Sequence, residues 1–177
     1  MVRSIVIPHN VDDRPYLADL ANLGEFQEAV GGWLEPIEVE GLDVTVYVNE
    51  ALQRELTPVN ARATALRWFF SNRPDRGHFM VGDVVLTARD HDDTVADLSE
   101  EVVFGLIYCH QFVVMVSSDG ENWYETPACF GTVFEAALWA LVMSMGSELS
   151  VTIRGIGPDE DQSDSTVQQG DRPWQEG

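Results

Sequence analysis

The side chains that most often do chemistry are scattered in this sequence. The histidines stand at positions 9, 78, 91 and 110, far apart along the chain. The sequence contains no G-x-S-x-G, H-E-x-x-H, G-x-x-x-x-G-K or G-x-G-x-x-G, the spacings that build a nucleophile elbow, a zinc pair or a phosphate loop. The sequence therefore favours a non-enzymatic protein, although an enzyme with another type of site stays open.

Two groups of residues carry side chains that bind metals elsewhere. Cys109, His110 and Cys129 offer the thiolates and imidazole that zinc prefers, but adjacent ligands without a C-x-x-C pair form an unusual frame. Residues 90–93, Asp-His-Asp-Asp, offer oxygen and nitrogen ligands, but a charged loop is commonly only solvated. We expect reduced structural cysteines, no metal site and no cofactor.

Polar residues at the ends of predicted elements are the main candidates for a binding site. Asn49 and Glu50 end a predicted strand, Asn60 begins a predicted helix, and Asp83 lies at an irregular point of another strand. Such positions lie on the rims of folds, where binding sites form. Helix capping and turn formation explain the same residues equally well.

Arginines gather in one short window. Arg62, Arg67, Arg73 and Arg76 lie within fifteen residues and form a local basic patch on an acidic chain. Arg62 is the member that we include among the binding candidates. The alternative is that these side chains make surface ion pairs, each worth under about 1 kcal/mol.

The elements that must position these residues belong to the α+β class. Alternating or apolar runs predict strands at 4–8, 34–40, 44–48, 79–86, 112–116, 123–125 and 149–153. Helices are predicted at 24–30, 60–72, 99–107 and 133–145. Short strands and a hairpin at Asp119-Gly120 indicate a small, mostly antiparallel sheet with helices packed on it.

Two of the predicted helices have a defined apolar surface. The helix that follows Asn60 would bury Ala61, Ala65, Trp68 and Phe69, which recur at helical spacing. The helix at 133–145 is apolar almost all round. It must therefore be buried against the sheet or against a partner.

The charge of the chain excludes several classes of partner. Thirty Asp and Glu stand against ten Arg and no Lys, which gives a net charge of −20. Such a surface repels nucleic acid and membrane surfaces and attracts basic proteins.

The longest apolar stretch, at 133–142, is about half of the roughly 20 residues that a membrane span needs. The N-terminus lacks the pattern of a secretory leader, so we expect a cytoplasmic protein that binds neither DNA nor membranes directly.

The chain divides into three parts by composition. Residues 1–107 hold most of the predicted elements, and residues 108–154 add a hairpin and the apolar helix on the same core. Residues 155–177 are acidic and poor in apolar side chains, which predicts a disordered tail. Trp174 is the aromatic exception in that tail, either incidental or part of a short motif that docks on a partner.

The segments that resemble a known family are distributed over the first 107 residues. They are Gln27, Val30-Gly31-Gly32, Glu35-Pro36, Tyr47-Val48-Asn49-Glu50, Asn60, Ala63-Thr64 and Val81-Gly82-Asp83-Val84-Val85-Leu86. In order and spacing they resemble the domain of unknown function 3846. The resemblance implies a mobile-element context, because members occur largely in bacteriophages, often of actinobacterial hosts, and in plasmid-type elements. It brings no catalytic residue and no substrate.

These observations together predict a non-enzymatic phage or mobile-element protein that binds and modulates a host protein. The partner would be basic or DNA-binding, and a sharper form of the hypothesis is DNA mimicry, in which carboxylates imitate duplex phosphates. One alternative is an enzyme or small-ligand-binding protein with Asn49, Glu50, Asp83 and His78 around a pocket. Another is an oligomeric assembly component that uses the helix at 133–145 as its contact.

Overall fold

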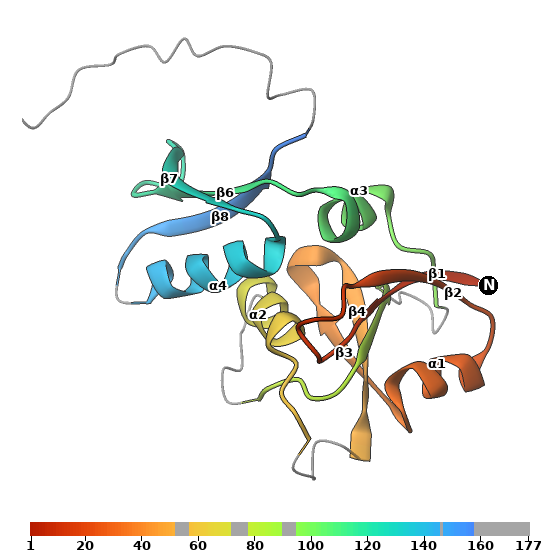
Figure 1. Ribbon diagram of the computed structural model, residues 1–177. Coiled ribbons are helices and arrows are strands. Elements are labelled where there is room, and N and C mark those ends of the chain that lie inside the picture. Colours follow the sequence, from red (N-terminus) through yellow and green to blue (C-terminus); the bar gives the residue numbers. More distant parts are fainter. Residues whose placement is uncertain (52–56, 72–77, 90–94, 146, 158–177) are drawn as a thin grey trace, which may run out of the picture.

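The chain forms two antiparallel sheets with helices between and beside them (Figure 1). The computed structural model describes residues 1–51, 57–71, 78–89, 95–145 and 147–157. The predictions for Arg73 and Arg76, for the acidic loop at 90–93 and for the tail with Trp174 lie outside these residues. The predicted α+β class with antiparallel sheets and packed helices is confirmed.

The larger sheet has five strands in the order β2-β1-β5-β4-β3. Its strands are β1 (Val2–Ile7), β2 (Tyr16–Leu20), β3 (Leu34–Val39), β4 (Val44–Asn49) and β5 (Val84–Ala88). All its pairs are antiparallel, and Ile7 faces Val84 while Tyr47 faces Val85. This register brings the end of β1, the end of β4 and the start of β5 together at one end of the three inner strands. We call this end of the strands the sheet edge.

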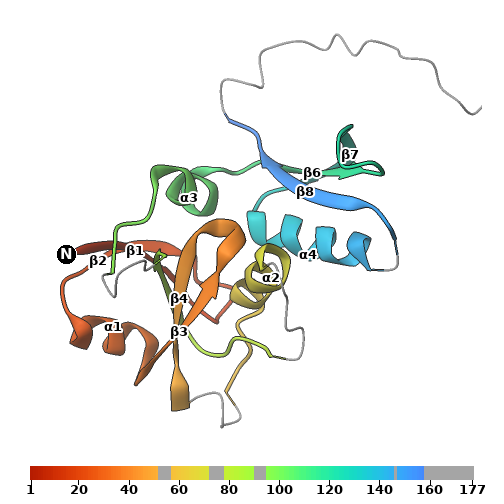
Figure 2. The same ribbon diagram turned by 180° about the vertical axis from the view of Figure 1, so that it is seen from behind.

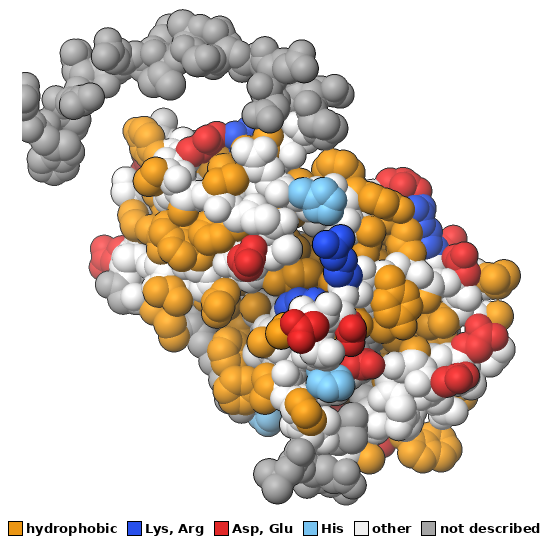
Figure 3. Space-filling view, viewed as in Figure 1, with side chains coloured by type: hydrophobic (Ala, Val, Ile, Leu, Met, Phe, Trp, Pro, Cys, Tyr) orange, Lys and Arg blue, Asp and Glu red, His pale blue; other side chains and the backbone are white. Residues whose placement is uncertain are grey.

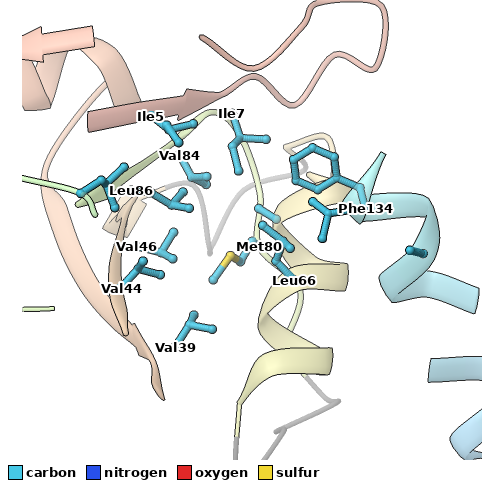
Figure 4. Packing of buried hydrophobic residues seen from close by; sticks show 14 of the residues in the cluster. Ile5, Ile7, Val39, Val44, Val46, Leu66, Met80, Val84, Leu86 and Phe134 are labelled. Atoms are coloured by element: carbon cyan, nitrogen blue, oxygen red, sulfur yellow. The ribbon is translucent and has the colours of Figure 1, made fainter. Parts of the chain in front are cut away.

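The two faces of this sheet pack against different helices. In β1, Ile5 and Ile7 join the main core, whereas Val6 between them joins a second cluster with Phe26 and Val30. This alternation follows from the two-residue period of a strand. Helix α1 (Leu23–Val30) therefore covers one face, and the main core lies on the other (Figure 4).

Helix α2 (Ala61–Phe70) packs over the main core, and its N-cap is Asn60 as predicted. Its buried residues are Ala63, Thr64, Ala65 and Leu66. The predicted buried face was wrong at Ala61, which is exposed, while Trp68 and Phe69 are partly buried. Two sides of α2 are covered, because Ala63 and Leu66 join the main core and the helix also packs against a second helix at residues 133–144.

The C-terminal part begins with α3 (Glu100–Val103), which continues into a π-helical turn η3 (Phe104–Tyr108). The smaller sheet follows, in the order β7-β6-β8, with β6 (Phe112–Ser117), β7 (Tyr124–Phe130) and β8 (Ser150–Gly155). Helix α4 (Val133–Ser144) connects β7 to β8. In both views α4 lies beside α2, between the two sheets (Figures 1 and 2).

One hydrophobic cluster joins both parts of the described chain. It contains Ile5 and Leu86 from the larger sheet, Leu66 from α2, and Val114 and Phe134 from the C-terminal part. The N-terminal elements and the added hairpin and helix therefore share a core. None of the helices in the described ranges is long and apolar enough to cross a membrane.

Candidate functional site

Asn60 is the centre of a hydrogen-bonded junction at the edge of the larger sheet. Its side chain is fully buried, and its Nδ2 donates to the carbonyls of Ile7 and Gly82, both at 2.9 Å. Its Oδ1 accepts the backbone N–H of Ala63 at 3.0 Å and caps α2. With its amide fully engaged, Asn60 holds β1, the turn before β5 and α2 together and offers nothing to a ligand.

Asn49 is also a structural residue. It is 3% exposed, its Nδ2 donates to the carbonyl of Gly31 at 2.8 Å, and its Oδ1 accepts the N–H of Ala51 at 3.0 Å. Gly31 ends α1 in the left-handed conformation with φ of 76°. A Cβ on Gly32 would lie 2.4 Å from the Asn49 Nδ2, so the paired glycines and Asn49 fit one another. The neighbouring Glu50 is exposed.

Arg62, at the start of α2, binds the loop that follows β1. Its Nη1 donates to the carbonyl of Asp13 at 2.8 Å, and its Nη2 donates to those of Pro8 and Asn10, both at 2.6 Å. Partial burial lowers the pKa of the guanidinium, while the carboxylates of Asp13 and Asp83 act in the opposite direction. The sequence did not indicate this role, because every residue has a backbone carbonyl, and hydrogen bonds to such groups leave no pattern in the sequence.

Asp83 forms a close pair with His9. The Asp83 Oδ1 lies 2.6 Å from the His9 Nδ1 and accepts the His9 backbone N–H at 2.8 Å. Both side chains are about two-fifths exposed, at 39% each. Asn60, Arg62, Asp83 and His9 therefore meet at the sheet edge, whereas Asn49 bonds to the end of α1. The structure brings part of the predicted rim together, and most of its polar groups are occupied by the fold.

A cavity of about 660 Å³ lies next to Arg62. Four segments enclose it: the loop between β1 and β2, the start of α2, the η3 turn with the residues that follow it, and the first turn of α4. Its lining includes the charged or titratable side chains of Arg14, Arg62, His110 and Glu135 and the apolar side chains of Leu106, Ile107 and Phe134. Figure 3 shows Arg and His side chains near the centre of this face, with hydrophobic side chains on both sides.

Helix α4 is buried along one side only. Ala136, Ala137 and Ala140 are fully buried against α2 and the smaller sheet. On the opposite side Leu138, Val142 and Met145 are 58%, 61% and 61% exposed. We call these three residues, spaced four and three apart, the apolar stripe. The prediction that this helix would be buried holds for one of its sides, and the other side has no cover within the described chain.

The sequence analysis weighed Cys109, His110 and Cys129 as zinc ligands and expected no metal site. The Cys109 thiol is buried and donates to the carbonyls of Gln111 and Ile156 at 3.3 and 3.7 Å. Cys129 is a free, exposed thiol, and His110 is exposed beside the cavity. Among the residues that the structure describes, no three His, Cys, Asp or Glu side chains are placed to hold a metal ion.

Fold and site define an α+β protein with two antiparallel sheets and a polar junction at the edge of the larger one. The chain belongs to the family of domain of unknown function DUF3846, whose model matches residues 2–122. That match ends after β6, so the family segment includes part of the smaller sheet. Comparisons with curated proteins and with solved structures gave no match.

Proposed function

We propose that this protein is a non-enzymatic binding protein of a phage or other mobile element that contacts and modulates a host protein through the apolar stripe of α4. The observation that carries the proposal is the exposure of Leu138 and Val142 on α4, and of Met145 at the C-cap of that helix, while the opposite side of α4 is buried. The mobile-element context rests on the family, and the expected place of action is the host cytoplasm.

The geometry of the stripe suits the insertion of a helix face into a groove. Apolar side chains spaced by three and four residues are the anchors by which a helix binds such a groove. Complete burial of a Leu, Val or Met side chain contributes about 1.5–3 kcal/mol. Single exposed apolar residues are common on proteins, but Leu138 and Val142 lie one turn apart on the same side of α4, and Met145 follows three residues later at the C-cap.

The negative charge of the chain favours a partner that carries basic residues. Glu135 is exposed on the first turn of α4, and Glu148 is exposed shortly after Met145. A partner with an apolar groove and a basic rim would match this arrangement. A second copy fits less well, because two chains of −20 repel one another when their surfaces approach.

The DNA-mimic form of the hypothesis needs a continuous acidic surface. On the face shown in Figure 3, acidic side chains lie in separate groups among hydrophobic ones. The proposal therefore rests on the apolar stripe, and the acidic surface serves to attract a basic partner and to speed its association.

The test begins with capture from an actinobacterial host lysate on immobilised protein, against an equally acidic control protein. A captured protein is then purified and titrated with wild type, with Leu138→Gln/Val142→Gln and with Leu23→Gln. Leu23 is a matched control because it is an exposed leucine, 63% accessible, on α1. We expect the double variant to weaken binding at least tenfold, roughly 1.4 kcal/mol, and Leu23→Gln to leave it unchanged.

Two results would contradict the proposal. Equal affinity of the double variant and wild type would place the contact elsewhere. A wild-type dimer that becomes monomeric in the double variant, measured by light scattering, would assign the stripe to a second copy and support the assembly alternative.

A further inference from the structure

The cavity beside Arg62 has the size and lining of a small-molecule site, independently of the apolar stripe. Its volume of about 660 Å³ lies within the range of roughly 300–1,000 Å³ that holds small ligands and cofactors. The segments that enclose it come from both the N-terminal elements and the C-terminal part, which packing around one shared core fixes relative to each other.

The cavity carries positive charge on a strongly negative protein. Arg14 and Arg62 both line it, together with the exposed His110. Other arginines are paired with carboxylates, namely Arg3 with Glu100, Arg89 with Glu38 and Arg154 with Glu125. Arg14 is exposed and makes no hydrogen bond or ion pair with any residue in the described ranges. On a chain where acids outnumber arginines three to one, such an arginine is available to an anion.

Arg62 is the second arginine of the cavity lining and is partly buried. Its Nη atoms hold the backbone carbonyls of the loop that bears Arg14, so Arg62 sets the position of the loop. Its Nε is buried and has no partner among the described residues, and its guanidinium lies 6.0 Å from the ring centre of Phe134. The Arg62 charge therefore reaches the cavity, while most of its hydrogen bonds serve the fold.

The other lining residues suit an organic ligand better than a simple ion. Leu106, Ile107 and Phe134 supply an apolar surface, against which a ring can pack. The Glu135 carboxylate also lines the cavity and accepts a hydrogen bond from the Thr132 hydroxyl at 3.1 Å. Its free acceptor capacity suits a hydroxyl or amino donor, and its charge opposes a ligand that is only anionic.

We propose that this cavity binds a phosphorylated small molecule of nucleotide type. Arg14 and His110 hold the phosphate, Glu135 accepts a hydroxyl or amino group, and the ring packs on Leu106, Ile107 and Phe134. Arginine favours phosphate because its planar fork of N–H donors matches the phosphate oxygens.

The test is a calorimetric titration of the full chain with adenosine, guanosine, cytidine and uridine 5′-monophosphates, and with each corresponding nucleoside and inorganic phosphate as fragments. At least one monophosphate binds, more tightly than either of its fragments. Arg14→Gln weakens that binding at least tenfold, whereas the matched control Arg67→Gln, which removes the same charge from α2 outside the cavity, leaves it unchanged.

A second variant tests the position of the site without altering charge. A Cβ on Gly105 would have no atom within 4 Å, and this residue lines the cavity, so Gly105→Phe is expected to fold and to occupy the ring site. It should abolish monophosphate binding while the thermal midpoint stays near that of wild type.

Three results would overturn the proposal. One is the absence of binding by all four monophosphates at concentrations up to about 1 mM. Another is equal binding of inorganic phosphate and the monophosphate, which would show an anion site without a ring site. The third is binding that survives both Arg14→Gln and Gly105→Phe.

Discussion

The edge of the larger sheet and the outer side of α4 use their side chains in opposite ways. At the sheet edge, Asn49 and Asn60 are polar and buried, and their amides bond to the protein's own backbone. On α4, Leu138 and Val142 are apolar and exposed, with no cover from the described chain. Asn49 and Asn60, within the family segment, thus build the fold, whereas the exposed apolar residues of α4 lie beyond the matched residues.

The contrast shows that polar residues at the ends of strands and helices are not by themselves evidence of a binding site. Polar residues at strand ends and helix starts attract attention because binding sites form there. The same positions leave backbone groups without partners, and a buried amide satisfies them. Burial of the side chain, rather than its chemical type, separates the two roles here.

The largest effect is expected at Asn60. Asn60→Ala removes the cap of α2 and leaves the buried carbonyls of Ile7 and Gly82 without donors, at a combined cost of about 4 kcal/mol. Urea unfolding followed by circular dichroism measures it. Asn22→Ala, which removes the exposed cap of α1, should cost only about 1 kcal/mol; equal losses would show that Asn60 is a simple cap.

The two sides of α4 should respond differently to the same truncation. Leu141 is 6% exposed, and Leu141→Ala should destabilise the protein by about 3 kcal/mol through the cavity it leaves. Leu138→Ala should change the free energy of unfolding by under about 0.5 kcal/mol, since this side chain is already in water. Similar losses at both positions, in the same urea experiment, would mean that the stripe is covered in solution.

The fit between α1 and β4 provides a third test. A Cβ in Gly32→Ala would lie 2.4–2.7 Å from three atoms of the Asn49 side chain, which should cost about 2 kcal/mol. Adding Asn49→Ala removes the clash, so the double variant should be more stable than the sum of the two losses predicts. Strict additivity in this cycle would contradict the contact.

The smallest effect concerns the hairpin turn of the smaller sheet. Hydrogen bonds from the backbone and side chain of Asn122, from Glu121 N–H and from Ser117 hold the pKa of Asp119 well below its ordinary value of 3.8. The stabilisation is therefore present above about pH 4 and is lost as the pH falls through the folded-state pKa. The stability difference between wild type and Asp119→Asn should be constant near pH 7 and shrink below pH 4; a difference that persists at the lowest pH would exclude a charge effect.

Much of the fold could be predicted from local patterns. The helices predicted at 24–30, 60–72 and 133–145 are present, and in the structure they are capped by Gly31, Asn60 and Thr132 respectively. Strand β2 could not be predicted, because Tyr16–Leu20 is short, carries the charged Asp19 and is an outermost strand of the sheet. The partition of the strands into two sheets is also set by tertiary packing rather than by periodicity.

The candidate site was predicted less well, for a physical reason. Asn60, Arg62 and Asp83 do lie near one another, but their partners are backbone carbonyls and His9, which are distant in sequence. No local spacing predicts such contacts. The exposed stripe had a partial sequence indication, since α4 is apolar almost all round, but which side would be covered depends on where α2 and the smaller sheet lie.

The central claim is that the apolar stripe of α4 contacts a protein other than a second copy of this chain. Photo-crosslinking in host cells tests it directly, with benzoylphenylalanine placed at Val142 or, as an equally exposed control, at Leu23. We expect position 142 to crosslink to one host protein, identified by mass spectrometry, and position 23 to give no such product. Crosslinking of position 142 to the same chain, or the same products from both positions, would contradict it.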